Sequence, residues 1–438
     1  MIALLLLFAV AGLMQAARTF TSETAFAGTE LAFGFLLLCA YFAGRVSSQL
    51  RLPKLTGYLI AGVVVGPFML DLVTKEMTSS LRVVNGVATC ILGLTAGSEL
   101  NLERVKSFAR PLRAVMLVSV VGSMLVIAGV IYLIRPLVPL FADLTSTQSI
   151  AVSALLGVAL SPQSPAVVMA LLAETRADGA LSRFMLASVV VADLVAVVAY
   201  SIAATFAGVT IGGGVDPLGT VVSVSWELLG SIVFGVAIGM VIGGFLRTVG
   251  NGASMFALLI CMIVAELGTR MHLDPLIVML AAGIWLENFS RADASKLLHG
   301  FESAQLPVFL VWFALAGTRL DLVQLTAVIG PVMIIAASRA GWHFVATRFA
   351  ADRAGAPPEV SRHAWIGLVP QAGLSLAFLV VIPKAFPTFG PSAAVLLLGV
   401  LAVNQLVSPI LLRSALVRSG EAGKKQGGDF AAESGTSH

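Results

Sequence analysis

One carboxylate stands alone in a long apolar part of the chain. Asp193 is the only charged residue between residues 184 and 208, a stretch long enough to cross a membrane. A carboxylate at the centre of a bilayer costs roughly 2.5–3.5 kcal/mol on insertion scales, so it usually faces a cavity or a partner. Burial raises the pKa of a carboxyl group and a nearby cation lowers it, so such a group can bind a proton or a metal cation in turn. We therefore interpret Asp193 as an ion- and proton-binding residue for transported Na⁺ or K⁺; the alternatives are a helix-packing group and a protonated bystander.

Two prolines three residues apart interrupt the apolar stretch "LLGVALSPQSPAVVMALLAE" at 155–174. Each proline removes a backbone donor and clashes with the preceding turn, so we expect the helix to unwind there. Irregular backbone at membrane depth is tolerated only where it is buried in protein or lines a wet cavity. Ser161, Gln163 and Ser164 add side-chain oxygens at this break, and we expect them to complete the ion- and proton-binding site around Asp193.

A second break is predicted in "AWIGLVPQAGLSLAFLVV" at 364–381, where Pro370, Gln371 and Gly373 form a similar weak point. Interruptions at matching places in two halves of a chain are typical of inverted-repeat transporters, whose substrate site lies where the broken helices meet. The alternative is that each proline makes an ordinary structural kink.

The two halves match in the residues around their breaks as well. The span after the first break contains Asp193, and the span after the second contains Asn404. Arg339 lies inside the span before the second break, and the repeat places it near Asp193. We expect Arg339 to compensate the charge of that carboxylate; the alternative is that it snorkels to the cytoplasmic end of its helix.

The composition indicates a polytopic helical membrane protein. Of the 438 residues, 58% are apolar and 11% are charged, whereas soluble domains carry about 25% charged residues. Cys39, Cys90 and Cys261 lie scattered in apolar runs, so we expect buried free thiols and neither disulfides nor a metal cluster. We expect no cofactor, no nucleic-acid partner and no nucleotide-binding domain, because the basic residues are dispersed and no strand–glycine-loop–helix unit occurs.

Thirteen apolar runs reach roughly spanning length. They are residues 29–48, 55–73, 82–99, 111–138, 147–173, 184–208, 224–246, 253–272, 274–290, 304–320, 323–347, 364–386 and 392–413. Residues 1–28 precede them as a hydrophobic segment and a loop; the first part, residues 1–17, is either an extra helix or a cleaved signal. Residues 414–438 are predicted to form a disordered cytoplasmic tail.

The basic residues predict an orientation in the membrane. Most of the 27 lysines and arginines fall in alternate loops, and this alternation persists through all the spans. By the positive-inside rule, those loops and the C-terminus are cytoplasmic. We expect a multi-pass protein of the cell inner membrane, with the lipid bilayer as its environment.

Five stretches carry motifs with glycines and prolines in a set order. They are "RLPKLTGYLIAGVVVGP" (51–67), "ILGLTAGSELNLERV" (91–105), "LPVFLVWFALAGTRLDL" (306–322), "GLVPQAGLSLAFLV" (367–380) and "NQLVSPILLR" (404–413). In these motifs residues 29–413 resemble the monovalent cation:proton antiporter superfamily, and most of all the second cation:proton antiporter branch of the sodium/hydrogen exchanger family.

The resemblance implies an all-α fold of about 13 transmembrane helices with two crossing broken helices. It implies a core near residues 111–208 and 323–413, a separate dimerisation domain, and a homodimer in which the core moves like an elevator. Asp193 matches the ion- and proton-binding aspartate of that family, and Arg339 matches the basic residue of the helix before the second break.

The chain departs from the family pattern at three positions. Gln163 and Ser164 stand where Thr-Asp is frequent, Ala192 stands where a polar residue often precedes the aspartate, and Gln371 stands where an Arg or Gly is common. The site therefore keeps one carboxylate, which favours electroneutral exchange of one proton for one cation.

Three other functions are alternatives to proton–cation exchange. An organic-anion symporter on a similar scaffold is expected to have a wider pocket with more basic or aromatic lining. An intramembrane protease needs Ser/His, paired Asp or a zinc motif within its spans, so we do not expect an enzyme. A transport-inactive sensor or channel relative is the third alternative, and ion flux in vesicles separates it from an antiporter.

Overall fold

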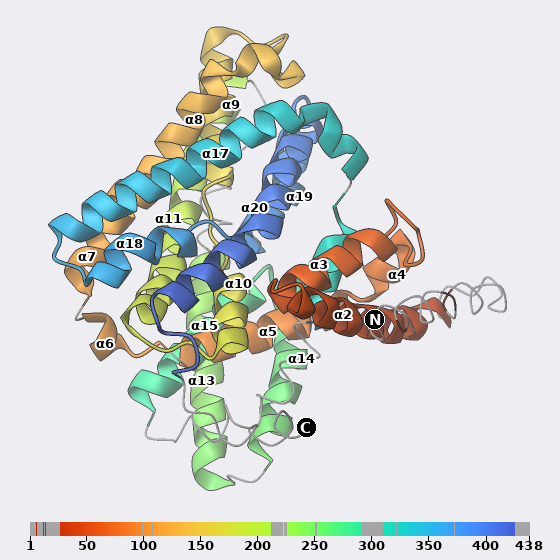
Figure 1. The fold of residues 1–438 in the computed structure, drawn as a ribbon, viewed down its shortest axis with the longest axis vertical. Helices are drawn as coiled ribbons and strands as arrows, with labels where there is room; N and C mark the ends of the chain where they lie inside the picture. The colour runs from red at the N-terminus through yellow and green to blue at the C-terminus, as the bar shows by residue number, and fades with distance from the viewer. Residues whose placement is uncertain are drawn as a thin grey trace.

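The computed structural model describes nearly all of the membrane region. It covers residues 27–98, 100–106, 108–211, 226–249, 252–290, 310–320, 322–371 and 373–424, with Leu6, Gly12, Met14 and Val222 as single residues. All regular structure in these residues is helical (Figure 1). Most of the predicted N-terminal segment 1–28, and the end of the predicted tail after Lys424, lie outside the described residues.

The helices follow the predicted spans closely. They are α2 (Ala27–Gln49), α3 (Lys54–Val65), α4 (Lys75–Ser80), α5 (Arg82–Ser98), α6 (Leu102–Lys106), α7 (Ala109–Val115), η1 (Met116–Val121), α8 (Gly122–Leu133), η2 (Arg135–Leu137), η3 (Pro139–Phe141), α9 (Ser146–Ala159), α10 (Pro165–Thr175), α11 (Ala180–Ile211), η4 (Trp226–Gly230), α13 (Ser231–Thr248), α14 (Ala253–Met271), α15 (Pro275–Phe289), α17 (Leu322–Arg353), α18 (Pro358–Gly367), α19 (Gly373–Ala385) and α20 (Gly390–Arg418). Residues 310–318 are also helical. The last helix passes the predicted boundary at residue 413 and ends at Arg418.

Six of the described helices are long and apolar enough to cross a membrane by themselves. They contain the spans Leu31–Gln49, Ala109–Leu133, Ala180–Ile211, Ser231–Thr248, Val328–Arg353 and Gly390–Arg418. The other apolar helices are shorter, and two of them, α9 and α10, lie on either side of the first predicted break.

The helices group into two sets of neighbours. In the first, α8 contacts α9 and α17, α11 contacts α9 and α18, and α17 contacts α20. In the second, α5 contacts α14 and α15, and α13 contacts α15; the hairpin of α2 and α3 lies to one side (Figure 1). The first set, together with α10 and α19, which contact α11 and α20, carries both breaks, and we call these helices the core.

Close helix contact in the second set depends on glycine. A Cβ atom at Gly235 of α13 would lie 2.2 Å from the carbonyl oxygen of Val278, and one at Gly239 would lie 2.8 Å from that of Ala282. Both carbonyls belong to α15, so the "GVAIGMVIGG" stripe is a helix-packing face, as small residues at this spacing predict.

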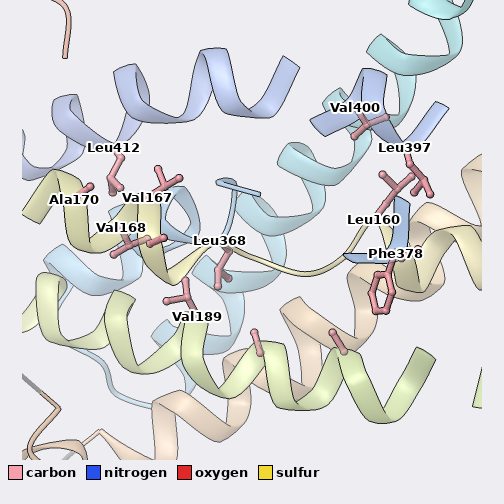
Figure 2. Packing of buried hydrophobic residues seen from close by; sticks show 14 of the residues in the cluster. Leu160, Val167, Val168, Ala170, Val189, Leu368, Phe378, Leu397, Val400 and Leu412 are labelled. Carbon is pink, nitrogen blue, oxygen red and sulfur yellow. The ribbon is translucent and has the colours of Figure 1, made fainter. Parts of the chain in front are cut away.

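An apolar shell surrounds the meeting point of the breaks (Figure 2). It contains buried side chains from α10, α11, α19, α20 and both breaks, including Leu160, Val168, Val189, Leu368 and Val400. Gln163, Arg339 and Gln371 are buried polar side chains at this place, so their partners must come from the protein or from a bound ion.

Candidate functional site

Both predicted breaks are present. The first helix ends at Ala159 and resumes at Pro165, and the second ends at Gly367 and resumes at Gly373. Carbonyls in both gaps accept hydrogen bonds from side chains in place of helical N–H groups, and Pro370 lies inside the second gap. The prediction of two broken helices is therefore confirmed.

Side-chain amides bind two of the free carbonyls at the first break. The Nε2 group of Gln371 donates to the carbonyl of Leu160 at 2.6 Å, and the Nε2 group of Gln163 donates to that of Ser161 at 2.6 Å. Asn404 in turn donates from Nδ2 to Oε1 of Gln371 at 2.6 Å. Gln371 and Asn404 thus connect the second break and α20 to the first break.

Arg339 binds carbonyls from both breaks. Its Nη1 group donates to Val369 at 2.7 Å, and its Nη2 group donates to Leu368 at 2.9 Å and to Pro162 at 3.4 Å. The side chain is fully buried, so the snorkelling alternative is wrong. Within the described part of the chain Arg339 forms no ion pair with Asp193; its hydrogen bonds go to the main chain instead.

Three buried side-chain oxygens near the first break have no hydrogen-bond partner in the described structure. They are Oγ of Ser161, Oε1 of Gln163 and Oδ1 of Asp193. The main chain of Gln163 faces the Asp193 carboxylate, and Val189, about one turn before Asp193, lies against the break in Figure 2. A buried polar atom without a partner calls for an explanation, and a bound ion is one.

Ser164 has a different role from the other polar residues of the break. Its Oγ accepts a hydrogen bond from the N–H of Val167 at 3.2 Å and so caps α10, whose first residue is Pro165. A serine before a proline at the first helical position is a common helix start. This bond occupies part of the acceptor capacity that we expected Ser164 to offer an ion.

The oxygens at the site are mostly neutral. In the part of the chain that the structure describes, no group of three or more His, Cys, Asp or Glu residues is placed to hold a metal ion. Asp193 is the one carboxylate among the site residues predicted from the sequence, and the others offer neutral hydroxyl and amide oxygens. Cys39, Cys90 and Cys261 are buried and free, as predicted.

The sequence interpretation missed a buried polar cluster next to Arg339. His343 lies one turn further along α17, and its Nδ1 is 2.9 Å from Oγ of Ser119, which is 2.8 Å from Oγ1 of Thr347. Ser119 lies on η1, a π-helical segment of a kind found often at functional sites. The spacing of Arg339, His343 and Thr347 at intervals of four was the available signal, because it places all three on one face of a helix.

A family model for the transmembrane region of sodium/hydrogen exchangers matches residues 33–418. A curated relative from Methylorubrum extorquens, described as an uncharacterized protein in the phaC 3' region, is 33% identical over 76 residues. That match spans 17% of this chain and 28% of the relative's length.

Two solved structures of the sodium proton antiporter MjNhaP1 from Methanocaldococcus jannaschii share the fold. One, determined at pH 8, has a TM-score of 0.62 and covers 91% of this chain and 99% of that chain. The other, from electron microscopy, has a TM-score of 0.66 and covers 88% and 96%. Sequence identity is 14% in both comparisons, so the likeness establishes the arrangement of helices.

Proposed function

Because the chain belongs to the sodium/hydrogen exchanger family, we propose that it exchanges protons for Na⁺ or K⁺ across a membrane and serves pH and cation homeostasis. The observation that carries this proposal is the Asp193 carboxylate, which the unwound main chain at Gln163 faces and whose buried Oδ1 has no hydrogen-bond partner in the described structure. Oγ of Ser161 and Oε1 of Gln163 are also unpartnered and supply neutral ligand oxygens.

Asp193 binds one cargo at a time in this proposal. At high proton activity the carboxyl is protonated and a cation leaves; at low proton activity the carboxylate is ionised and a cation replaces the proton. Since Asp193 with a bound proton and Asp193 with a bound cation are both neutral, exchanging one cargo for the other leaves the charge of the site unchanged in the membrane interior, where added charge is costly.

One carboxylate that exchanges one proton for one cation favours electroneutral transport. Arg339 supports the site mainly by holding the two breaks together through the carbonyls of Pro162, Leu368 and Val369. The ion pair with Asp193 that direct charge compensation would require is absent from the described residues.

We infer the remaining architecture from the family and the charge pattern. The protein is a homodimer in the cell inner membrane with its C-terminus in the cytoplasm, and its core near residues 111–208 and 323–413 moves relative to the other helices. The basic loops support this orientation through the positive-inside rule.

Proton flux in proteoliposomes tests the function. A pH-sensitive dye is followed after pulses of Na⁺, K⁺ or Li⁺, with wild type compared to Asp193→Asn, which keeps the size of the side chain. We expect cation-driven flux in the wild type and its loss in the variant. Flux that persists in Asp193→Asn contradicts the assignment of Asp193, and flux that follows an imposed membrane potential contradicts electroneutrality.

A further inference from the structure

We propose that Glu174 and Arg413 fasten the core to the start of α3, and that these contacts must open in each transport cycle. The structure is then a state in which the interface between the core and α3 is fastened on the cytoplasmic side and open on the opposite side. This inference rests on the alternating access that the proposed function requires, and it assigns that function two residues outside the ion site.

Glu174 caps a helix that is distant in sequence. The N–H of Lys54, the first residue of α3, donates to Oε1 of Glu174 at 2.8 Å. Pro53 precedes that helix and has no side-chain group able to cap it. The free N–H groups and partial positive charge of a helix N-terminus favour a carboxylate, so Glu174, at the end of α10, supplies the cap from the core.

Arg413 makes the second contact at the same place. Its Nη1 group donates to the carbonyl of Arg51 at 3.0 Å, and its charge also acts on the carboxylate of Glu174. Arg51 has a φ of 62°, a left-handed conformation that a residue with a side chain adopts only when its surroundings hold it. The turn before α3 therefore presents two groups to the core: the carbonyl of Arg51 as an acceptor and the N–H of Lys54 as a donor.

The opposite side of the same interface is open. A cavity of about 820 Å³ lies between α4 and the segment 310–320 on one side and α19 and α20 on the other; Thr78, Leu315, Leu379 and Ala394 are among its lining residues. Ala394 and Arg413 are both on α20, and at 1.5 Å per residue they lie roughly 28 Å apart along that helix. One end of α20 thus lines an open cavity while the other is bonded to the turn before α3.

These contacts are joined to the ion site by one short helix. The helix α10 runs from Pro165, at the first break, to Thr175, next to Glu174. A movement of the core that carries the break across the membrane must also carry Glu174 away from Lys54. The two hydrogen bonds consequently stabilise one access state over the other without touching the transported ion.

Cysteine accessibility tests this proposal without measuring transport. Ala394→Cys places a thiol in the cavity, and the native thiols at Cys39, Cys90 and Cys261 are buried. A membrane-impermeant maleimide is added from outside, and its rate of labelling is measured for Ala394→Cys alone. The same rate is measured for Ala394→Cys combined with Glu174→Gln or with Arg413→Gln. The matched control is Glu103→Gln, which changes an exposed glutamate of α6.

We expect each contact variant to slow labelling by about two- to fivefold, because removing the charge from one contact shifts the two-state equilibrium up to about tenfold and the labelling rate follows the population of the accessible state. Labelling should be unchanged in Glu103→Gln. Equal labelling in all four proteins would overturn the proposal, and so would equal slowing by the control. Since no gradient or cargo is needed, the outcome is independent of whether Asp193 carries the exchange.

Discussion

Replacing Arg339 distinguishes two roles for its side chain. In the first, which we call the clasp, its hydrogen bonds to main-chain carbonyls hold the two breaks together; in the second, its charge compensates that of Asp193. Arg339→Met removes short donors to Val369 at 2.7 Å and Leu368 at 2.9 Å, and a long one to Pro162 at 3.4 Å. A buried acceptor left without its donor costs about 1–3 kcal/mol, so two strong bonds and one weak bond predict a loss of about 2–5 kcal/mol in the free energy of unfolding.

Arg339→Lys keeps the positive charge but loses the planar guanidinium group, whose two terminal nitrogens donate in different directions. A single ammonium group cannot reproduce a planar fork whose two nitrogens bind carbonyls on different segments. We therefore expect Arg339→Lys to recover at most about half of the loss. The assay is equilibrium unfolding of the purified protein in detergent, followed by tryptophan fluorescence.

A double-mutant cycle with Asp193→Asn completes the test. If Arg339 serves as a clasp, Asp193→Asn should change the free energy of unfolding in the same direction with and without Arg339→Met, with a coupling below about 1 kcal/mol that reflects their neighbouring contacts on the first break. Full recovery by Arg339→Lys, together with rescue of Arg339→Met by Asp193→Asn, would refute the clasp and favour direct charge pairing.

Three further outcomes are expected. Asn404→Leu should lower the free energy of unfolding by about 1–3 kcal/mol, because Oε1 of Gln371 loses its donor at 2.6 Å; unchanged denaturant unfolding would contradict this. Gly62→Ala should destabilise by about 1–3 kcal/mol in the same assay, because its Cβ would lie 1.9 Å from the carbonyl oxygen of Ala314, whereas Gly34→Ala, with open space around it, should be neutral; equal effects of the two would refute the close contact. In flux assays a tenfold rise in cation concentration should move the pH of half-maximal exchange by about one unit toward acid, since one-for-one competition depends on the ratio of the two ions; a shift below about half a unit would argue against competition.

The breaks could be predicted because their cause is local. A proline disrupts its own helix whatever surrounds it, so the gaps at Ser161–Ser164 and around Pro370 follow from the sequence. The unusual position of Asp193 could be predicted for the same reason, because the free-energy cost of a carboxylate in an apolar span depends on its immediate neighbours in the sequence.

The partners of the polar side chains could not be predicted in the same way. Arg339 donates a hydrogen bond to Pro162, which is 177 residues away in the sequence. Its acceptors are main-chain carbonyls, which every residue has, so the residue types in the sequence do not indicate which carbonyls it binds. His343 was overlooked although it is one turn from Arg339, because its partner Ser119 lies on a different helix. Ser164 is the opposite case, since the Ser-Pro pair that makes it a helix cap is visible in the sequence.

The end of the chain shows how distant contacts move a boundary. A disordered tail was predicted from residue 414, but α20 continues to Arg418, and the next residues are held by the core. Glu421 accepts hydrogen bonds from the N–H groups of Leu181 and Ser182 at 2.8 Å each, which caps the start of α11. Composition indicates how polar a segment is, but it does not indicate whether a helix end elsewhere needs a carboxylate.

Counting the protons released when a cation binds is the most direct test of the account. Purified protein is titrated with Na⁺ or K⁺ by calorimetry in two buffers that differ in ionisation enthalpy, which gives the number of protons released per cation. We expect about one proton per cation in the wild type and no measurable release in Asp193→Asn. Binding that releases the same number of protons in the variant would show that the exchanged proton resides elsewhere, and Asp193 could not be the group that holds both ions in turn.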